Sequence, residues 1–79
     1  KQMNGRLADT LLYLDSLKNE TAEIFQLLSR KDIADFAGIS TESTVKLLKA
    51  FEKEGLIELH EKDIRLLKQD ALTEISRRG

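Results

Sequence analysis

The stretch from Ser29 to Ile57 constrains the fold of this chain most, because it predicts two helices joined by a tight turn. Ser29 followed three residues later by Asp32 is a variant of the capping box that begins helices. Gly38 is expected to end the first helix, since glycine readily takes the left-handed backbone conformation found there. Ser40 is then placed to cap the second helix with its hydroxyl oxygen. The pattern predicts a helical pair whose second helix is offered outward.

The second predicted helix is amphipathic. Its apolar set recurs at positions i, i+3, i+4 and i+7 and comprises Thr44, Leu47, Leu48 and Phe51. The first helix takes its apolar positions from Ile33, Ala34, Phe36 and Ala37. A small residue such as Ala34, four residues before Gly38, lets two helices cross closely at a steep angle. We interpret the pair as a helix-turn-helix, and the alternative is an ordinary helical hairpin.

Residues on either side predict elements that pack on this pair. From Gln2 to Lys18 a helix is expected, with a buried stripe of Met3, Leu7, Leu11, Leu14 and Leu17 that Leu12 and Tyr13 broaden. The alternative, the end of a coiled-coil seam, is weaker because the repeat extends over barely two heptads. Residues 19–23 are polar and predict a loop, and Ile24–Leu28 predicts a brief strand.

The segment from Leu56 to Leu67 alternates between apolar and polar residues and predicts a β-hairpin, called the wing below. Its register should place Leu59 opposite Ile64 and Ile57 opposite Leu66, with Glu61-Lys62 at the tip. The strand at 24–28 would pair with it. Neither tip residue favours a positive φ, so a mobile tip is expected. Asp70 should cap a last short helix, with Leu72 and Ile75 inward and Arg77 and Arg78 near its end.

These elements predict one domain over residues 1–79, mainly α with a small β-hairpin, as a winged helix-turn-helix. The expected order is helix, short strand, two helices, wing hairpin and short helix. The expected core comprises Leu11, Leu14, Ile33, Leu47, Leu48, Phe51, Ile57 and Ile64. At this length a hydrophobic core is marginal, so each apolar stripe is needed for packing.

The sequence DIADFAGISTESTVKLLKAFEKEGLI resembles the DNA-binding half of the Crp/Fnr transcription regulators. The similarity extends upstream to GRLADTLLYL and downstream through LHEKDIRLL. The resemblance implies that Gly38 and Ser40 form the family's turn and that Glu42 is its base-reading glutamate. Lys46 stands where the family has arginine, and Thr41 stands where some members place a further arginine. It also implies a β-barrel sensor domain and a dimerising helix, neither of which this chain contains, and a start at Lys1 suggests a piece of a longer protein.

We therefore expect double-stranded DNA as the partner, bound by a homodimer of the full-length protein at a palindromic site with a TGA-like half-site element. Base reading is assigned to Thr41, Glu42, Val45 and Lys46, at the start of the second helix. Phosphate contacts are assigned to Arg30, Ser40, Ser43, Lys49, His60 and Lys62. The plainer alternative for Glu42 and Lys46 is an exposed i, i+4 pair worth ~0.3 kcal/mol.

The overall charge argues mildly against DNA, because 13 Lys+Arg and 14 Asp+Glu give a net charge of -1 whereas nucleic-acid binders tend to be basic. Attraction would then depend on Lys46, Lys49 and Lys53 sharing one face. The rival function is a winged helix that contacts a protein partner through Val45, Lys49 and the wing. Salt dependence of binding separates the two functions.

The residues give little support for catalysis. His60 is the only histidine, there is no cysteine, and there is no glycine-rich phosphate loop. We expect no enzyme, no metal site and no cofactor in this domain. No apolar run approaches the ~20 residues that span a bilayer and no signal peptide is evident, so a cytoplasmic protein without a membrane segment is expected.

Overall fold

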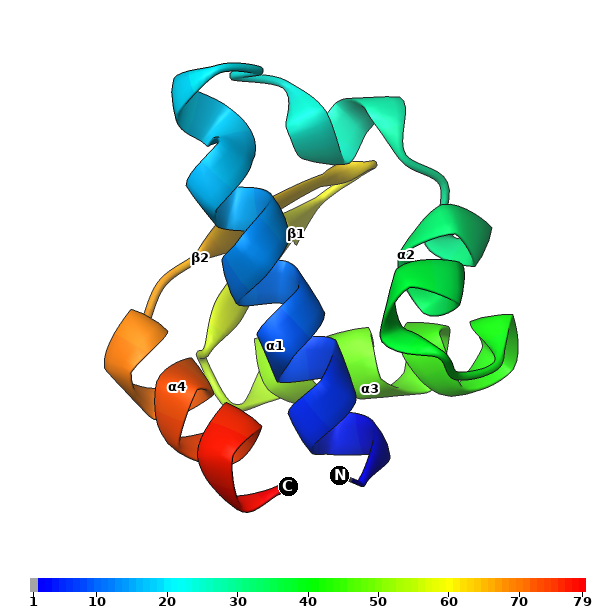
Figure 1. Ribbon diagram of the computed structural model, residues 1–79, viewed down its shortest axis with the longest axis vertical. Helices are drawn as coiled ribbons and strands as arrows, with labels where there is room; N and C mark the ends of the chain where they lie inside the picture. Colours follow the sequence, from blue (N-terminus) through cyan, green and yellow to red (C-terminus); the bar gives the residue numbers. More distant parts are fainter. Residues whose placement is uncertain (1) are drawn as a thin grey trace.

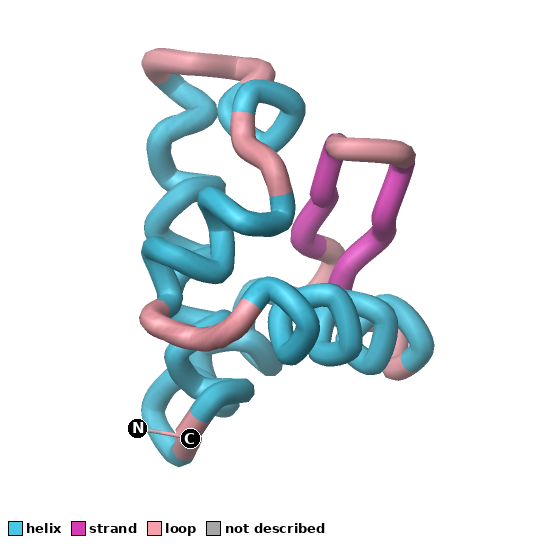
Figure 2. The backbone as a smooth tube through the Cα atoms, turned by 90° about the vertical axis from the view of Figure 1, so that its right-hand side faces the viewer, coloured by secondary structure: helices cyan, strands magenta, loops and turns pink. Residues whose placement is uncertain are grey.

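The computed structural model describes residues 2–79, in which α1 lies at the centre of the fold (Figure 1). The elements are α1 (Met3–Ser16), η1 (Leu17–Asn19), η2 (Ile24–Leu27), α2 (Arg30–Ala37), α3 (Thr41–Lys53), β1 (Ile57–His60), β2 (Asp63–Leu66) and α4 (Gln69–Arg78), with η marking 3-10 turns. α4 packs along α1, α2 crosses α3, and the hairpin stands beside α3 (Figure 2). The mainly helical winged helix-turn-helix expected from the sequence is confirmed.

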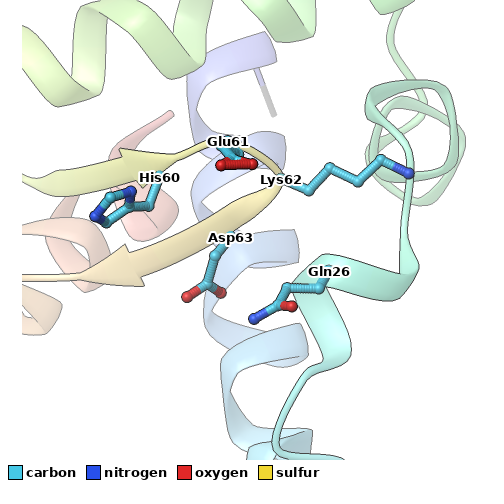
Figure 3. A pocket seen from close by; sticks show the side chains of 5 residues that line it. All are labelled: Gln26, His60, Glu61, Lys62 and Asp63. Carbon is cyan, nitrogen blue, oxygen red and sulfur yellow. The ribbon is translucent and has the colours of Figure 1, made fainter.

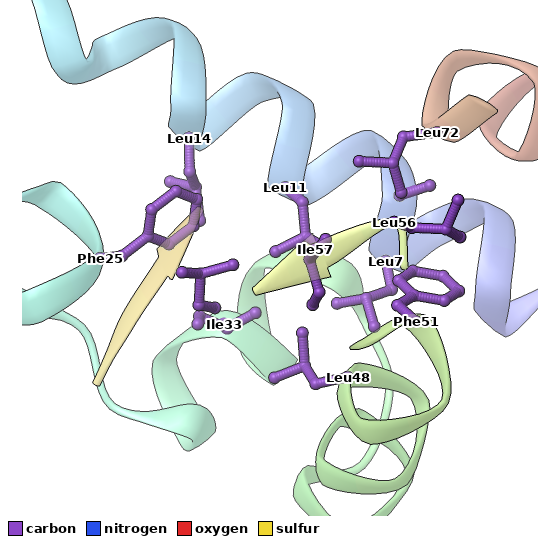
Figure 4. Close-up of a cluster of buried hydrophobic side chains, with 12 residues drawn as sticks. Leu7, Leu11, Leu14, Phe25, Ile33, Leu48, Phe51, Leu56, Ile57 and Leu72 are labelled. Atoms are coloured by element: carbon purple, nitrogen blue, oxygen red, sulfur yellow. The ribbon is translucent and has the colours of Figure 1, made fainter. Parts of the chain in front are cut away.

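The core forms where α1 meets the other elements (Figure 4). Its fully buried residues are Leu7, Leu11, Leu14, Phe25, Ile33, Leu48, Ile57, Ile64 and Leu72, with Phe51 and Leu56 nearly so. Of the residues expected in the core, all but Leu47 are buried, and Leu47 is partly buried against the cluster. The apolar spacing of α1 and α3 thus predicted most of this core.

Three apolar residues assigned to buried stripes are instead exposed: Met3 at 51%, Tyr13 at 57% and Phe36 at 59%. The helices that carry them bury narrow stripes. α2 packs through Ile33, Ala34 and Ala37, so Phe36 points away from both neighbouring helices. Helical spacing gives the direction of a stripe, but the neighbouring elements decide its width.

The predicted strand at 24–28 is wrong, because residues 24–27 form the 3-10 turn η2. Phe25 is fully buried, whereas Leu27 is 68% exposed. A half-buried strand would place both on the same face, so the apolar residues here do not follow a strand's two-residue repeat. η2 lies beside β2 without joining it, and the sheet in residues 2–79 has β1 and β2 as its strands.

The helix termini follow the predicted signals at both ends of the helix-turn-helix. The Asp32 amide donates to Ser29 Oγ over 3.0 Å and the Ser29 amide donates to Asp32 Oδ2 over 2.9 Å, which completes the capping box. The hydrogen bond that the Ser29 backbone amide donates to the Asp32 carboxylate lowers the pKa of Asp32 from its ordinary value, and the Ser29 side chain adds to this effect. Gly38 takes a φ of 73° and ends α2.

At the other end, α3 finishes in a Schellman motif, as expected. The Leu56 amide donates to the Phe51 carbonyl over 2.9 Å, the Gly55 amide donates to the Glu52 carbonyl over 2.9 Å, and Gly55 has a φ of 78°. This ending turns the chain from α3 directly into β1 and so places the wing beside the helix.

The wing has the predicted register, with Ile57 opposite Leu66 and Leu59 opposite Ile64. Glu61 at its tip adopts a φ of 58°, the conformation that its residue type disfavours. The mobility of this tip stays a prediction.

Asp70 is not the cap of α4. The N-cap is Lys68, whose carbonyl accepts from the Leu72 amide over 3.1 Å, and Asp70 lies in the first turn. The helix begins earlier because the Leu67 and Lys68 amides both donate to the Leu56 carbonyl, which turns the chain at once after β2. Leu72 is buried, Ile75 packs partly against the core, and Arg77 and Arg78 lie in the last turn as predicted.

Candidate nucleic-acid interface

The N-terminus of α3 is held by hydroxyl contacts. Ser40 Oγ accepts from the Ser43 amide over 3.0 Å and donates to Ser43 Oγ over 2.9 Å. Thr44 Oγ1 donates to the Ser40 carbonyl over 3.0 Å from inside the fold. These bonds fix how α3 leaves the turn, and therefore which side chains its first turn exposes.

The residues assigned to base reading lie in the first turns of α3. Thr41, Glu42 and Lys46 are exposed, whereas Val45 is half-buried. Within residues 2–79, neither Glu42 nor Lys46 has an ion-pair partner. The plainer alternative, an exposed i, i+4 ion pair between these two residues, is therefore not formed. Their charged groups remain available for an external partner.

Farther along α3, Lys49 and Lys53 are exposed on the same side as Lys46. Glu52 is engaged elsewhere, because its Oε2 accepts from the Leu59 amide of β1 over 3.2 Å. That contact directs one acidic side chain of α3 toward the wing, whereas Glu42 remains exposed on the same helical face as the three lysines.

The wing places two further assigned residues at the edge of this surface. His60 and Lys62 are exposed, and their side chains extend from opposite sides of the tip (Figure 3). A surface pocket under the tip is lined by Gln26, His60, Glu61, Lys62 and Asp63. The residues predicted to contact phosphates therefore lie on the wing as well as on α3.

Arg30, also assigned to a phosphate, is bound to the protein itself. Its Nη2 donates to the Glu61 carbonyl over 3.0 Å and its Nη1 to the Lys62 carbonyl over 3.4 Å. Partial burial lowers the pKa of Arg30. The structure thus connects the first residue of α2 to the wing tip.

Sequence reasoning missed the long basic side chains that join distant elements. Arg6 Nη1 donates to the Gly38 carbonyl in the helix-turn-helix turn over 3.2 Å. Lys18 Nζ donates to the Ile64 carbonyl of β2 over 3.3 Å and lies 5.3 Å from the centre of the Phe25 ring. No local pattern marks these contacts, because the partners are 32 and 46 residues apart.

Other classes of site find no support in the described part of the chain. Residues 2–79 contain no group of at least three His, Cys, Asp or Glu side chains arranged to hold a metal ion. None of the helices in that range has the length and apolar character needed to cross a membrane.

The family profile described as the Crp-like helix-turn-helix domain matches residues 5–75. The chain belongs to this family. Crp-like helix-turn-helix domains are DNA-binding domains of transcription regulation, and the family is not enzymatic. The match includes α2, α3 and both strands of the wing, so the family assignment covers the whole candidate interface.

A curated relative is the transcriptional regulatory protein btr of Bordetella pertussis, strain Tohama I, which is 30% identical over 74 residues. The alignment covers 89% of this chain and 31% of the relative. This Crp-like chain therefore spans about a third of the length of the curated relative that it matches.

Proposed function

We propose that this Crp-like domain reads double-stranded DNA sequence-specifically, as part of a dimeric, effector-responsive transcription regulator. The observation that carries the proposal is the exposed start of α3, where Glu42 and Lys46 lack ion-pair partners within residues 2–79. A helix that follows a helix-turn-helix turn presents its N-terminal residues to base edges in the major groove. The shape of the domain and its family both support this use of α3.

Glu42 accepts a hydrogen bond from cytosine N4 in the proposed complex, and Lys46 donates to guanine O6 and N7 of the same G·C pair. This pair belongs to a TGA-like element in each half-site. Thr41 and Val45 flank the two charged residues and contact thymine methyl groups. Residues that contact phosphates fix register without reading sequence, and these are Ser40, Ser43, Lys49, His60, Lys62 and Arg30.

The proposal treats residues 1–79 as one winged helix-turn-helix domain that reads DNA in the cytoplasm without a cofactor or catalysis of its own. Homodimerisation and the response to an effector belong to other parts of a longer regulator. The length of the btr relative, of which this chain covers 31%, supports that arrangement.

The proposed function is tested by the salt dependence of DNA binding. Neutralising each phosphate releases counterions, so the slope of log K against log salt changes by about 0.9 per contact. The Lys62→Gln variant should therefore have a slope shallower by about 0.9 than the wild-type slope. Fluorescence anisotropy with a labelled duplex at several salt concentrations measures this.

Arg78→Gln is the matched control, because Arg78 is exposed on α4 and pairs with Glu74 at 3.8 Å, away from the proposed interface. It should leave the slope unchanged. A shallow wild-type slope, equal in the Lys62→Gln variant, would contradict DNA binding and favour the protein-contact function that the net charge of -1 suggests.

A single copy of the domain should bind a half-site weakly, whereas two copies joined by a flexible linker should bind the palindrome tightly. Linking raises the effective concentration of the second copy and commonly increases affinity by about 10²- to 10⁴-fold without new contacts. Titration of one and two copies on half-site and palindromic duplexes measures the gain. Tight, noncooperative binding of one copy to one half-site would show that the reading unit is the monomer.

A further inference from the structure

The wing is attached to the helices by side chains that reach its backbone. Glu52 of α3 accepts from the Leu59 amide on β1, and Lys18 donates to the Ile64 carbonyl on β2. Both of these contacts lie along the strands, where Ile57 and Ile64 are also buried in the core. The tip lies beyond these contacts, and within residues 2–79 its backbone carbonyls accept hydrogen bonds from the Arg30 side chain of α2.

Arg30 binds two successive carbonyls at the tip. Nη2 lies 3.0 Å from the Glu61 oxygen and Nη1 lies 3.4 Å from the Lys62 oxygen. The planar guanidinium presents its donors as a rigid fork, which suits a pair of adjacent acceptors. Glu61 has a φ of 58° and is the one non-glycine residue in 2–79 with a positive φ, so the Arg30 guanidinium binds the backbone at this unusual conformation.

This contact joins two parts of the proposed interface. Arg30 is the first residue of α2 and lies between the two capping-box residues Ser29 and Asp32, so its backbone is fixed within the helix-turn-helix. Glu61 and Lys62 form the tip between β1 and β2. The hydrogen bonds from Arg30 to the Glu61 and Lys62 carbonyls therefore connect the helix-turn-helix to the tip of the wing.

We propose that Arg30 is a positioning residue that locks the wing tip onto the start of α2, so that His60 and Lys62 meet the DNA backbone in a fixed place. The inference rests on the proposed function and assigns Arg30 a role in addition to its expected phosphate contact. Ordering the tip in advance lowers the entropy cost of binding. It also makes the tip rigid, contrary to the expectation drawn from its residue types.

Arg30→Lys separates positioning from phosphate contact. Lysine keeps the positive charge that a phosphate needs but loses the fork that spans two carbonyls. Arg65→Lys is the matched control, since Arg65 is an exposed wing residue that pairs with Glu58 at 3.6 Å and does not touch the tip.

The first measurement concerns the protein without DNA. Backbone ¹⁵N relaxation should give order parameters near 0.85 at Glu61 and Lys62 in the wild type and in Arg65→Lys, falling toward about 0.6 in Arg30→Lys. Order parameters at α3 should remain unchanged in both variants, which verifies that each is folded. Equal tip order parameters in the wild type and in Arg30→Lys would overturn the lock.

The second measurement is a double-mutant cycle for DNA binding. Arg30→Lys should weaken binding about three- to tenfold in the native wing, the effect of losing a hydrogen-bonded contact, and hardly at all when His60→Ala and Lys62→Ala are already present. The Arg65→Lys control should bind like the wild type in both backgrounds.

The opposite pattern would assign Arg30 to a phosphate alone. Arg30→Lys would then bind like the wild type, and Arg30→Gln would weaken binding equally with and without the wing side chains. A wild-type chain without specific DNA binding would overturn the proposed function, whereas the order parameters would still establish or overturn the lock by themselves.

Discussion

Replacing Leu48 by alanine is expected to lower the free energy of unfolding by ~2 to 5 kcal/mol. Leu48 is 1% exposed, lies on the inner face of α3, and packs in the cluster shared by α1 and the wing (Figure 4). The substitution removes buried apolar contacts and leaves a cavity that close packing fills only in part. Because native domains are stable by only about 5 to 15 kcal/mol, much of this domain's stability depends on one side chain. Urea unfolding followed by circular dichroism measures the change.

Leu27→Ala is the matched control for that prediction. Leu27 is 68% exposed on η2, so the same chemical change should alter stability by no more than about 0.5 kcal/mol. Similar unfolding midpoints for the two variants would mean that α3 does not pack on the core as described.

Replacing Glu42 by alanine is expected to reduce discrimination at the G·C position of each half-site by ~1 to 3 kcal/mol. Glu42 is exposed in the first turn of α3, and its carboxylate has no ion-pair partner within residues 2–79. Without the carboxylate, cytosine N4 loses its acceptor, while contacts to phosphates persist. Competition binding of two linked copies to palindromes altered one base pair at a time measures the preference at each position.

Lys49→Ala provides the comparison, because Lys49 lies about two turns farther along α3 and is assigned to the DNA backbone. It should weaken binding to all sequences alike. If Glu42→Ala also shifts overall affinity and leaves the base preference intact, Glu42 is a surface residue and the base-reading assignment is wrong.

The parts of the fold predicted correctly depend on local signals. The Ser29–Asp32 capping box, the positive φ of Gly38 and the ending of α3 at Gly55 each involve residues within a few positions of one another. The wing register likewise follows from alternation, because a shift by one residue would bring Ile57 and Ile64 out of the core. Such signals are specified by the chain itself.

The incorrect predictions concern residues whose conformation or burial depends on contacts with neighbouring elements. Ile24–Leu28 is too short for its period to be read, and burial of Phe25 between α1 and β2 selected a 3-10 turn. Phe36 has the composition of a core residue, yet Ala34 and Ala37 fill the crossing with the other helices. For Asp70, two amides bonded to the Leu56 carbonyl moved the start of α4 to Lys68.

For the interface, the sequence by itself determined which residues begin α3 and which lie on the wing, since helix capping and strand alternation are local properties. Only the tertiary structure decided how these two parts are joined. The bond from Arg30 to Glu61 spans 31 residues, and that from Lys18 to Ile64 spans 46. The physical reason is that a long flexible side chain has no periodicity to reveal its partner, and its position becomes defined only when packing of the core brings the two backbones within its reach.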